Sequence, residues 1–94
     1  MTPHEERATV HYSGRVQGVG FRWRVRTAAE AHRVTGFVAN LRDGRVLLVA
    51  EGERDEIERF LGEVRERLAD HVADAAVAWG AATGEFGDFD VRRV

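Results

Sequence analysis

The sequence of 94 residues contains no cysteine and no lysine. Without cysteine the chain can form neither a disulfide bond nor a thiolate metal site, and it has no sulfur nucleophile for phosphate chemistry. All 14 of its basic side chains are therefore arginines. The nucleotide-binding loop in which a lysine reaches the terminal phosphates is excluded as well.

Long apolar stretches are also missing. No apolar run is long enough to span a bilayer, and the polar residues 1–7 lack the apolar core of a signal peptide. We therefore expect a cytoplasmic protein with no membrane partner, and we expect residues 1–7 to be flexible. The length, with 44% hydrophobic and 32% charged residues, is typical of one globular domain spanning residues 1–94. We expect this domain to be a monomer.

Positive charge is concentrated in the first half of the chain, although the net charge is −2. Residues 1–50 hold eight arginines and four acidic residues, whereas residues 51–94 hold six arginines and twelve acidic residues. This asymmetry predicts a local positive field that attracts a small anion, although Arg24 and Arg26 fit a solvated helix face equally well. Nucleic acid is disfavoured as a partner, because the whole chain is acidic and has no broad basic face.

The hydrophobic pattern predicts five strands and two helices. Strands are indicated by alternating or apolar segments at residues 8–13, 34–41, 46–50, 72–79 and 86–91. Helices are indicated by apolar residues at helical spacing in residues 21–32 and 53–69, and Gly52 is expected to end the third strand. The order β-α-β-β-α-β with an extra strand predicts an α+β fold, the ferredoxin-like βαββαβ sandwich. Its two helices would cover one face of an antiparallel sheet with a fifth strand at its edge.

The loop between the first strand and the first helix is the main candidate for a binding site. Its glycines can curl so that several backbone N–H groups converge, and the positive end of the following helix adds to the same concavity. Arg22 supplies a planar fork that matches phosphate or carboxylate oxygens. We predict a small-anion cradle for phosphate, with turn geometry alone as the alternative. Its candidate residues are Arg15, Val16, Gln17, Gly18, Val19, Gly20, Phe21 and Arg22.

Asn40 is the second candidate, because it interrupts an otherwise apolar strand just before the Asp43-Gly44 hairpin turn. An asparagine there can simply cap the turn. In the predicted topology, however, the end of the second strand lies near the first loop. The Asn40 amide can then hold a water molecule beside a bound phosphate. The four histidines show no metal-ligand spacing, so we predict no metal site and no cofactor.

These segments resemble the acylphosphatase family. The similarity is carried by GRVQGVGFR at residues 14–22 and by GFVANLRDGRV at residues 36–46. The resemblance implies metal-free hydrolysis of a small-molecule acyl phosphate to a carboxylate and inorganic phosphate, with phosphate as both product and ligand. By matching position, Arg22 would bind the phosphoryl group together with the loop amides, and Asn40 would orient the attacking water.

Two positions depart from the usual family pattern, which has tryptophan and arginine where this chain has Phe37 and Ala39. We expect Phe37 to keep an aromatic ring in the core. We expect the Ala39 side chain to point to the sheet face opposite Asn40, so that little is lost, and we expect any effect to fall on substrate affinity rather than on mechanism. No general base is evident, because the nearest candidates, His11 and Asp43, have structural explanations.

Other functions stay open beside an acylphosphatase. The same cradle would serve a phosphate sensor that binds without turnover. It would also suit a carbamoyl-phosphate-handling domain of the kind found in hydrogenase maturation proteins, although the lack of a further domain argues against it. An RNA-binding module is disfavoured, because the first and third strands lack an exposed aromatic pair on which bases stack.

Overall fold

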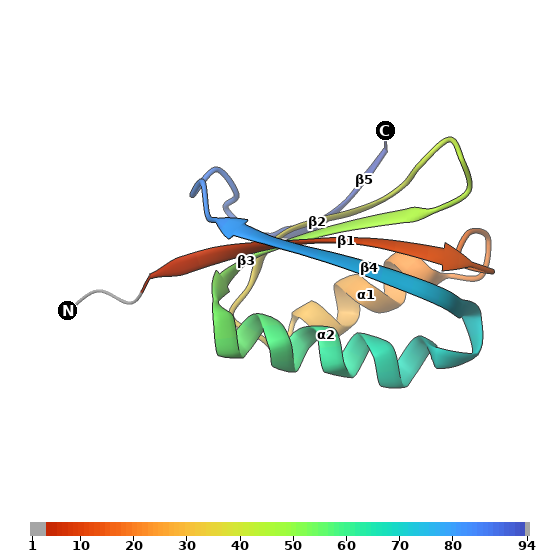
Figure 1. Ribbon diagram of the computed structural model, residues 1–94, viewed down its shortest axis with the longest axis horizontal. Coiled ribbons are helices and arrows are strands. Elements are labelled where there is room, and N and C mark those ends of the chain that lie inside the picture. The colour runs from red at the N-terminus through yellow and green to blue at the C-terminus, as the bar shows by residue number, and fades with distance from the viewer. Residues whose placement is uncertain (1–3, 94) are drawn as a thin grey trace.

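The computed structural model describes residues 4–93. In chain order its elements are β1 (Glu5–Gly14), α1 (Phe21–Ala29), β2 (Thr35–Asn40), β3 (Val46–Glu53), α2 (Arg54–Leu68), a 3-10 turn (Ala69–His71), β4 (Val72–Ala81) and β5 (Phe89–Arg93). The strands form one sheet in the order β4-β1-β3-β2-β5, and both helices cover the same face (Figure 1). The predicted α+β, ferredoxin-like sandwich is confirmed.

The sheet is mixed rather than purely antiparallel. β1 pairs antiparallel with β3 and β4, and β2 pairs antiparallel with β3. β5, however, runs parallel to β2, with Gly36 opposite Phe89 and Asn40 opposite Arg93. The prediction of an antiparallel sheet is therefore wrong for the fifth strand, while its position at the edge is confirmed.

The core lies between the helices and the sheet. Each helix buries one stripe of side chains at helical spacing. The buried residues of the two helices are Phe21, Val25, Ala28, Ala29, Ile57, Phe60, Val64 and Leu68. The rings of Tyr12 and Phe21 have centroids 5.2 Å apart. Because Tyr12 lies near the end of β1 and Phe21 begins α1, this contact fixes both ends of the predicted cradle loop against the core.

Two strands extend further than the sequence pattern predicts. β1 begins at Glu5, and residues from Glu5 to Arg7 pair with β3. The expectation of a flexible segment is therefore wrong for these residues, and residues 1–3 lie outside the described part of the chain. β3 continues through Gly52 to Glu53, so Gly52 does not end the strand.

A buried carboxylate ties the β4–β5 connection to the sheet. Glu51 of β3 is 2% exposed. It accepts hydrogen bonds from the backbone N–H groups of Thr83 (2.9 Å) and Gly84 (3.0 Å). Arg7 Nε donates to the same carboxylate at 2.7 Å. These contacts hold the connection that leads into β5, and β5 forms one wall of the candidate site.

Candidate functional site

The β1–α1 loop has the backbone conformation that a cradle of N–H groups requires. Gly18 and Gly20 have φ values of 77° and 76°, in the left-handed region that side chains other than glycine rarely adopt. Gly20 is the N-cap of α1 and supplies no side-chain cap, so the first helical N–H groups have no partner within the helix. Within residues 4–93, no backbone N–H from residue 16 to residue 23 donates to a protein acceptor. The loop therefore offers several free donors next to the positive end of a helix.

Gln17 anchors this loop to the β2–β3 turn. Its Nε2 donates to the carbonyl oxygens of Leu41 (2.7 Å) and Arg45 (3.0 Å). The turn is itself closed by the Leu41 N–H, which donates to the Arg45 carbonyl at 2.8 Å. Because β2 ends just before Leu41, the side chain of Gln17 fixes the distance between the loop and the end of β2. The loop and the turn lie at the same end of the sheet (Figure 1).

A cavity of about 210 Å³ lies between this loop, the end of β2 and the edge strand β5. Its lining residues are Val16, Gly18, Gly20, Phe21, Arg22, Trp23, Asn40 and Val91. The structure thus brings Arg22 and Asn40 together at one cavity, although 17 residues separate them in the sequence. Of the other predicted residues, Arg15, Gln17 and Val19 do not line it.

Within the described part of the chain, the Arg22 guanidinium and the Asn40 Oδ1 atom have no protein partner. The Asn40 Oδ1 atom is buried and accepts no hydrogen bond from the residues described. Arg22 makes no ion pair and no side-chain hydrogen bond within residues 4–93, in contrast to Arg26, which pairs with Glu30. Buried polar atoms are normally satisfied, so an unpaired acceptor beside an unpaired guanidinium marks a place where a polar ligand or water fits.

Among residues 4–93, no acidic side chain lines the cavity, so these residues bring no negative charge to its wall. The candidate bases lie elsewhere. Asp43 is held by Arg45, whose Nε donates to Oδ2 at 2.9 Å, and this bond holds the pKa of the Asp43 carboxyl below its usual value. His11 does not line the cavity either. Within residues 4–93 there is no group of three or more His, Asp or Glu side chains placed to hold a metal ion.

The two departures from the family pattern lie on the far face of β2. Val38 belongs to the helix-side core, so Asn40 shares its face, while Phe37 and Ala39 point the other way. Ala39 lies opposite Asn40 in this sense, as expected. The expectation that Phe37 fills the core is wrong, because its ring packs against Phe86 on the outer face, with centroids 5.8 Å apart.

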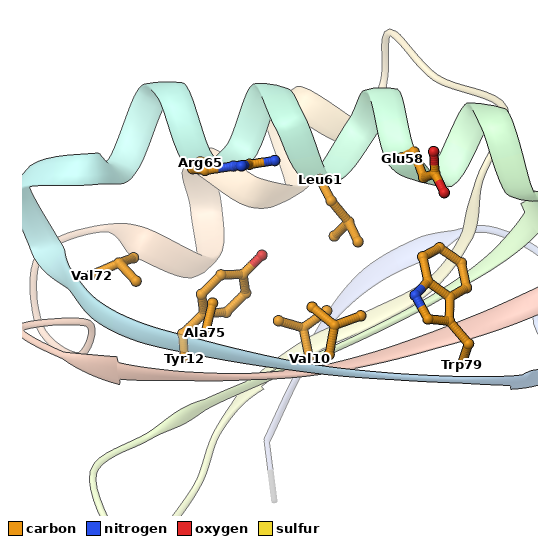
Figure 2. A pocket seen from close by; sticks show the side chains of 9 residues that line it. Val10, Tyr12, Glu58, Leu61, Arg65, Val72, Ala75 and Trp79 are labelled. Carbon is orange, nitrogen blue, oxygen red and sulfur yellow. The ribbon is translucent and has the colours of Figure 1, made fainter.

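A larger cavity, of about 670 Å³, lies between α2 and the β1–β4 side of the sheet (Figure 2). Its walls are mainly apolar, with Arg65 and Glu58 on the helix side and Trp79 on β4 (Figure 2). The Tyr12 hydroxyl points into it, and burial raises the pKa of this phenol. This cavity was not anticipated from the sequence, and neither the glycine loop nor Asn40 contributes to it.

Sequence reasoning also missed two lining residues of the smaller cavity. Trp23 follows Arg22 in the first turn of α1, and Val91 comes from β5. The signal for Trp23 was available, because a tryptophan outside the buried stripe of a helix is unusual. Val91 carried no such signal, since its placement depends on the parallel pairing of β5 with β2.

Comparisons with known proteins agree with the fold and identify the family. The family model described as Acylphosphatase matches residues 8–91. An acylphosphatase of Mycobacterium sp. (strain JLS) is 44% identical over 89 residues, covering 94% of this chain and 95% of the relative. The crystal structure of acylphosphatase from Bacillus subtilis superposes with a TM-score of 0.82 at 29% identity, covering 93% of this chain and 98% of that one.

A second solved structure, an acylphosphatase from Coxiella burnetii, is 41% identical and has a TM-score of 0.71. The match covers 95% of this chain and 94% of the Coxiella burnetii chain. The Mycobacterium relative and these two solved structures each match nearly the whole of this chain over nearly their own whole length. No helix within residues 4–93 is long and apolar enough to cross a membrane. By its sequence, its fold and its relatives, the chain belongs to the acylphosphatase family of hydrolases.

Proposed function

We propose that this chain hydrolyses acyl phosphates without a metal ion, with Arg22 and the loop amides binding the phosphoryl group and Asn40 positioning the attacking water. The observation that carries the proposal is the convergence of two unpaired polar groups, the Arg22 guanidinium and the buried Asn40 Oδ1, on one cavity. Family membership supports the reaction class. The residue roles are supported by this geometry and by the resemblance of residues 14–22 and 36–46 to the family motifs.

The phosphoryl group binds at the loop. Its oxygens accept from backbone N–H groups of residues 16–23 and from the Arg22 fork, which can engage two oxygens at once. The donors are set in place before the substrate arrives, because Gln17 and the Tyr12–Phe21 contact hold the loop. Donors that need no reorganisation stabilise charge as it develops on the phosphoryl oxygens in the transition state.

The water molecule is held by Asn40. Its Oδ1 accepts a hydrogen bond from one O–H of the water, whose proton stays on the water oxygen, and so directs a lone pair of that oxygen toward phosphorus. As the water oxygen bonds to phosphorus, the bond between phosphorus and the acyl oxygen breaks, and its electron pair leaves with the carboxylate. The other proton of the water, which is not bonded to Asn40, passes to a phosphoryl oxygen of the substrate. This route needs no protein base, and none of the described residues that line the cavity is acidic or a histidine.

Phosphate release from benzoyl phosphate in the presence of EDTA tests this proposal directly. We expect turnover with a rate that the chelator does not change, because residues 4–93 hold no cluster of metal-ligand side chains. A rate that falls with EDTA and returns with Mg²⁺ or Zn²⁺ would contradict the metal-free mechanism. No turnover at all, with or without metal, would leave a phosphate-binding module.

A further inference from the structure

Trp23 is unusually exposed for a large apolar side chain. It is 64% exposed, and among residues 4–93 only Val77 is a comparable case, at 47%. Trp23 nevertheless lines the cavity that holds Arg22 and Asn40, whereas Val77 lines the other cavity. Exposing an apolar side chain of this size to water is unfavourable. Because Trp23 lines the cavity, a ligand bound there would bury its ring.

The position of the indole is fixed from the helix side. The Arg26 guanidinium lies 5.4 Å from the Trp23 ring centroid, and Arg26 is itself held by Glu30 at 3.0 Å. Thr27 Oγ1 donates to the Trp23 carbonyl oxygen at 2.9 Å, which secures the first turn of α1. The indole ring is therefore restrained in its orientation before any ligand binds, because it makes a cation–π contact with Arg26.

The cavity has more room than a phosphate needs. A water molecule takes about 30 Å³ of the liquid, so the cavity of about 210 Å³ matches roughly seven waters, which is more than the five heavy atoms of a phosphate fill. Arg22, Asn40 and the loop account for the polar part of its wall. Of the apolar lining residues, Val16 and Phe21 are buried in the core, which leaves the side chains of Trp23 and Val91 for the part of the substrate that is not phosphate.

We propose that Trp23, with Val91, forms the subsite for the acyl group and makes the enzyme prefer acyl phosphates with an aromatic or bulky apolar acyl group over acetyl phosphate. This inference rests on the proposed function, because it needs the phosphoryl group to sit at Arg22. Trp23 is then a specificity-determining residue. Its contact with the acyl group is the same in the bound substrate and in the transition state, so its loss raises KM more than it lowers kcat.

The kinetic test compares kcat/KM for benzoyl phosphate and acetyl phosphate. In Trp23→Ala we expect the benzoyl-to-acetyl ratio to fall about fivefold, within the range of a single aromatic contact, and mainly through KM. Trp23→Phe should restore most of the ratio, because an aromatic face remains. Trp79→Phe is the matched control, since Trp79 lines only the other cavity, and it should leave the ratio unchanged. An unchanged ratio in Trp23→Ala would overturn the proposal.

A binding measurement separates this inference from the proposed function. The chain has two tryptophans, so Trp79→Phe leaves Trp23 as the only one and its fluorescence reports on the subsite. We expect benzoylphosphonate, which is not hydrolysed, to change the emission at several-fold lower concentration than acetylphosphonate. Equal affinities, or no change in emission, would overturn the subsite. A preference for benzoylphosphonate in a protein that hydrolyses no acyl phosphate would support the subsite and refute the proposed function.

Discussion

Replacing Glu51 by glutamine should destabilise the fold strongly, although the two side chains have nearly the same shape. The Glu51 carboxylate is buried and receives donors from Arg7, Thr83 and Gly84 at 2.7, 2.9 and 3.0 Å. Glutamine removes the negative charge and turns one acceptor into an NH₂ group that faces other donors. Arg7 then loses its buried partner.

The size of this effect follows from the number of contacts. Hydrogen bonds to a charged group contribute about 1.5–3 kcal/mol each, and breaking a buried ion pair costs about 3–5 kcal/mol. We expect Glu51→Gln to lose about 3 kcal/mol of unfolding free energy at pH 7. Because about 1 kcal/mol shifts the melting temperature of a domain this size by roughly 4–8 °C, the loss should exceed about 10 °C. Urea unfolding and thermal denaturation measure both quantities.

The loss should also depend on pH. Burial by itself raises the pKa of the Glu51 carboxyl, but the bonds from Thr83, Arg7 and Gly84 outweigh it and hold the pKa below its usual value. A group with a lowered folded-state pKa stabilises the fold fully above its unfolded pKa, about 4.3 for glutamate. That contribution disappears as pH falls through the folded-state pKa. The difference between wild type and Glu51→Gln should therefore shrink below about pH 4.3.

Glu85 provides the matched control. It also pairs with Arg7, but its side chain is 56% exposed. Surface ion pairs contribute little, so Glu85→Gln should unfold almost as the wild type does. The reasoning is refuted if Glu51→Gln is as stable as Glu85→Gln at pH 7, or if its deficit is the same at pH 3 as at pH 7.

Two further pairs of substitutions, each a test variant with its control, probe the site and the sheet. Arg22→Lys keeps the charge but loses the planar fork, so its kcat/KM for benzoyl phosphate should fall at least about 10²-fold. The control Arg24→Lys should stay near the wild-type value. Equal rates in the two variants would show that Arg22 has no part in the mechanism. Gly36→Ala should lose more than about 3 kcal/mol, because a Cβ there would lie 1.8 Å from the Val49 carbonyl oxygen. Gly62→Ala in α2, where a Cβ meets nothing within 4 Å, should instead raise the unfolding free energy by about 0.5–1 kcal/mol. Urea unfolding measures both variants, and comparable losses in the two would contradict this account.

The helices and the central strands could be predicted because each buries a regular stripe or row. Ile57, Phe60 and Val64 repeat at helical spacing, and the structure buries all three. The first three residues of β1 could not be predicted in this way. Glu5 to Arg7 look like a polar end, and they become a strand through their pairing with residues 51–53 of β3 and 80–81 of β4. The direction of β5 was hidden for the same reason, because a parallel pairing depends on a partner far away in the sequence.

In the candidate site too, features with a local sequence signal could be predicted, and features that depend on long-range contacts could not. Its glycine loop, Arg22 and Asn40 could be found from the sequence, since glycine conformation is local and the topology places the two ends together. The part played by Gln17 could not, because its amide reaches carbonyls of the β2–β3 turn 24 and 28 residues away. Glu51 was hidden as well. A glutamate at the end of an apolar strand looks like a solvent-exposed boundary until its partners from the β4–β5 connection are in place.

The central claim is that phosphate binding and water positioning belong to different residues. Measuring kcat and phosphate binding together on Asn40→Ala tests it most directly. The variant should fold, because Asn40 Oδ1 has no partner to lose among the described residues. We expect kcat for benzoyl phosphate to fall roughly 10²–10³-fold, while inorganic phosphate at about 100 times its Kd still stabilises the protein by roughly 2.7 kcal/mol.

Arg22→Ala is the counterpart in the same assays, and it should lose both the activity and the stabilisation by phosphate. The account predicts that Asn40→Ala binds phosphate as the wild type does and hardly turns over. It is contradicted if Asn40→Ala hydrolyses benzoyl phosphate at the wild-type rate, or if the wild type binds phosphate and releases none from the substrate.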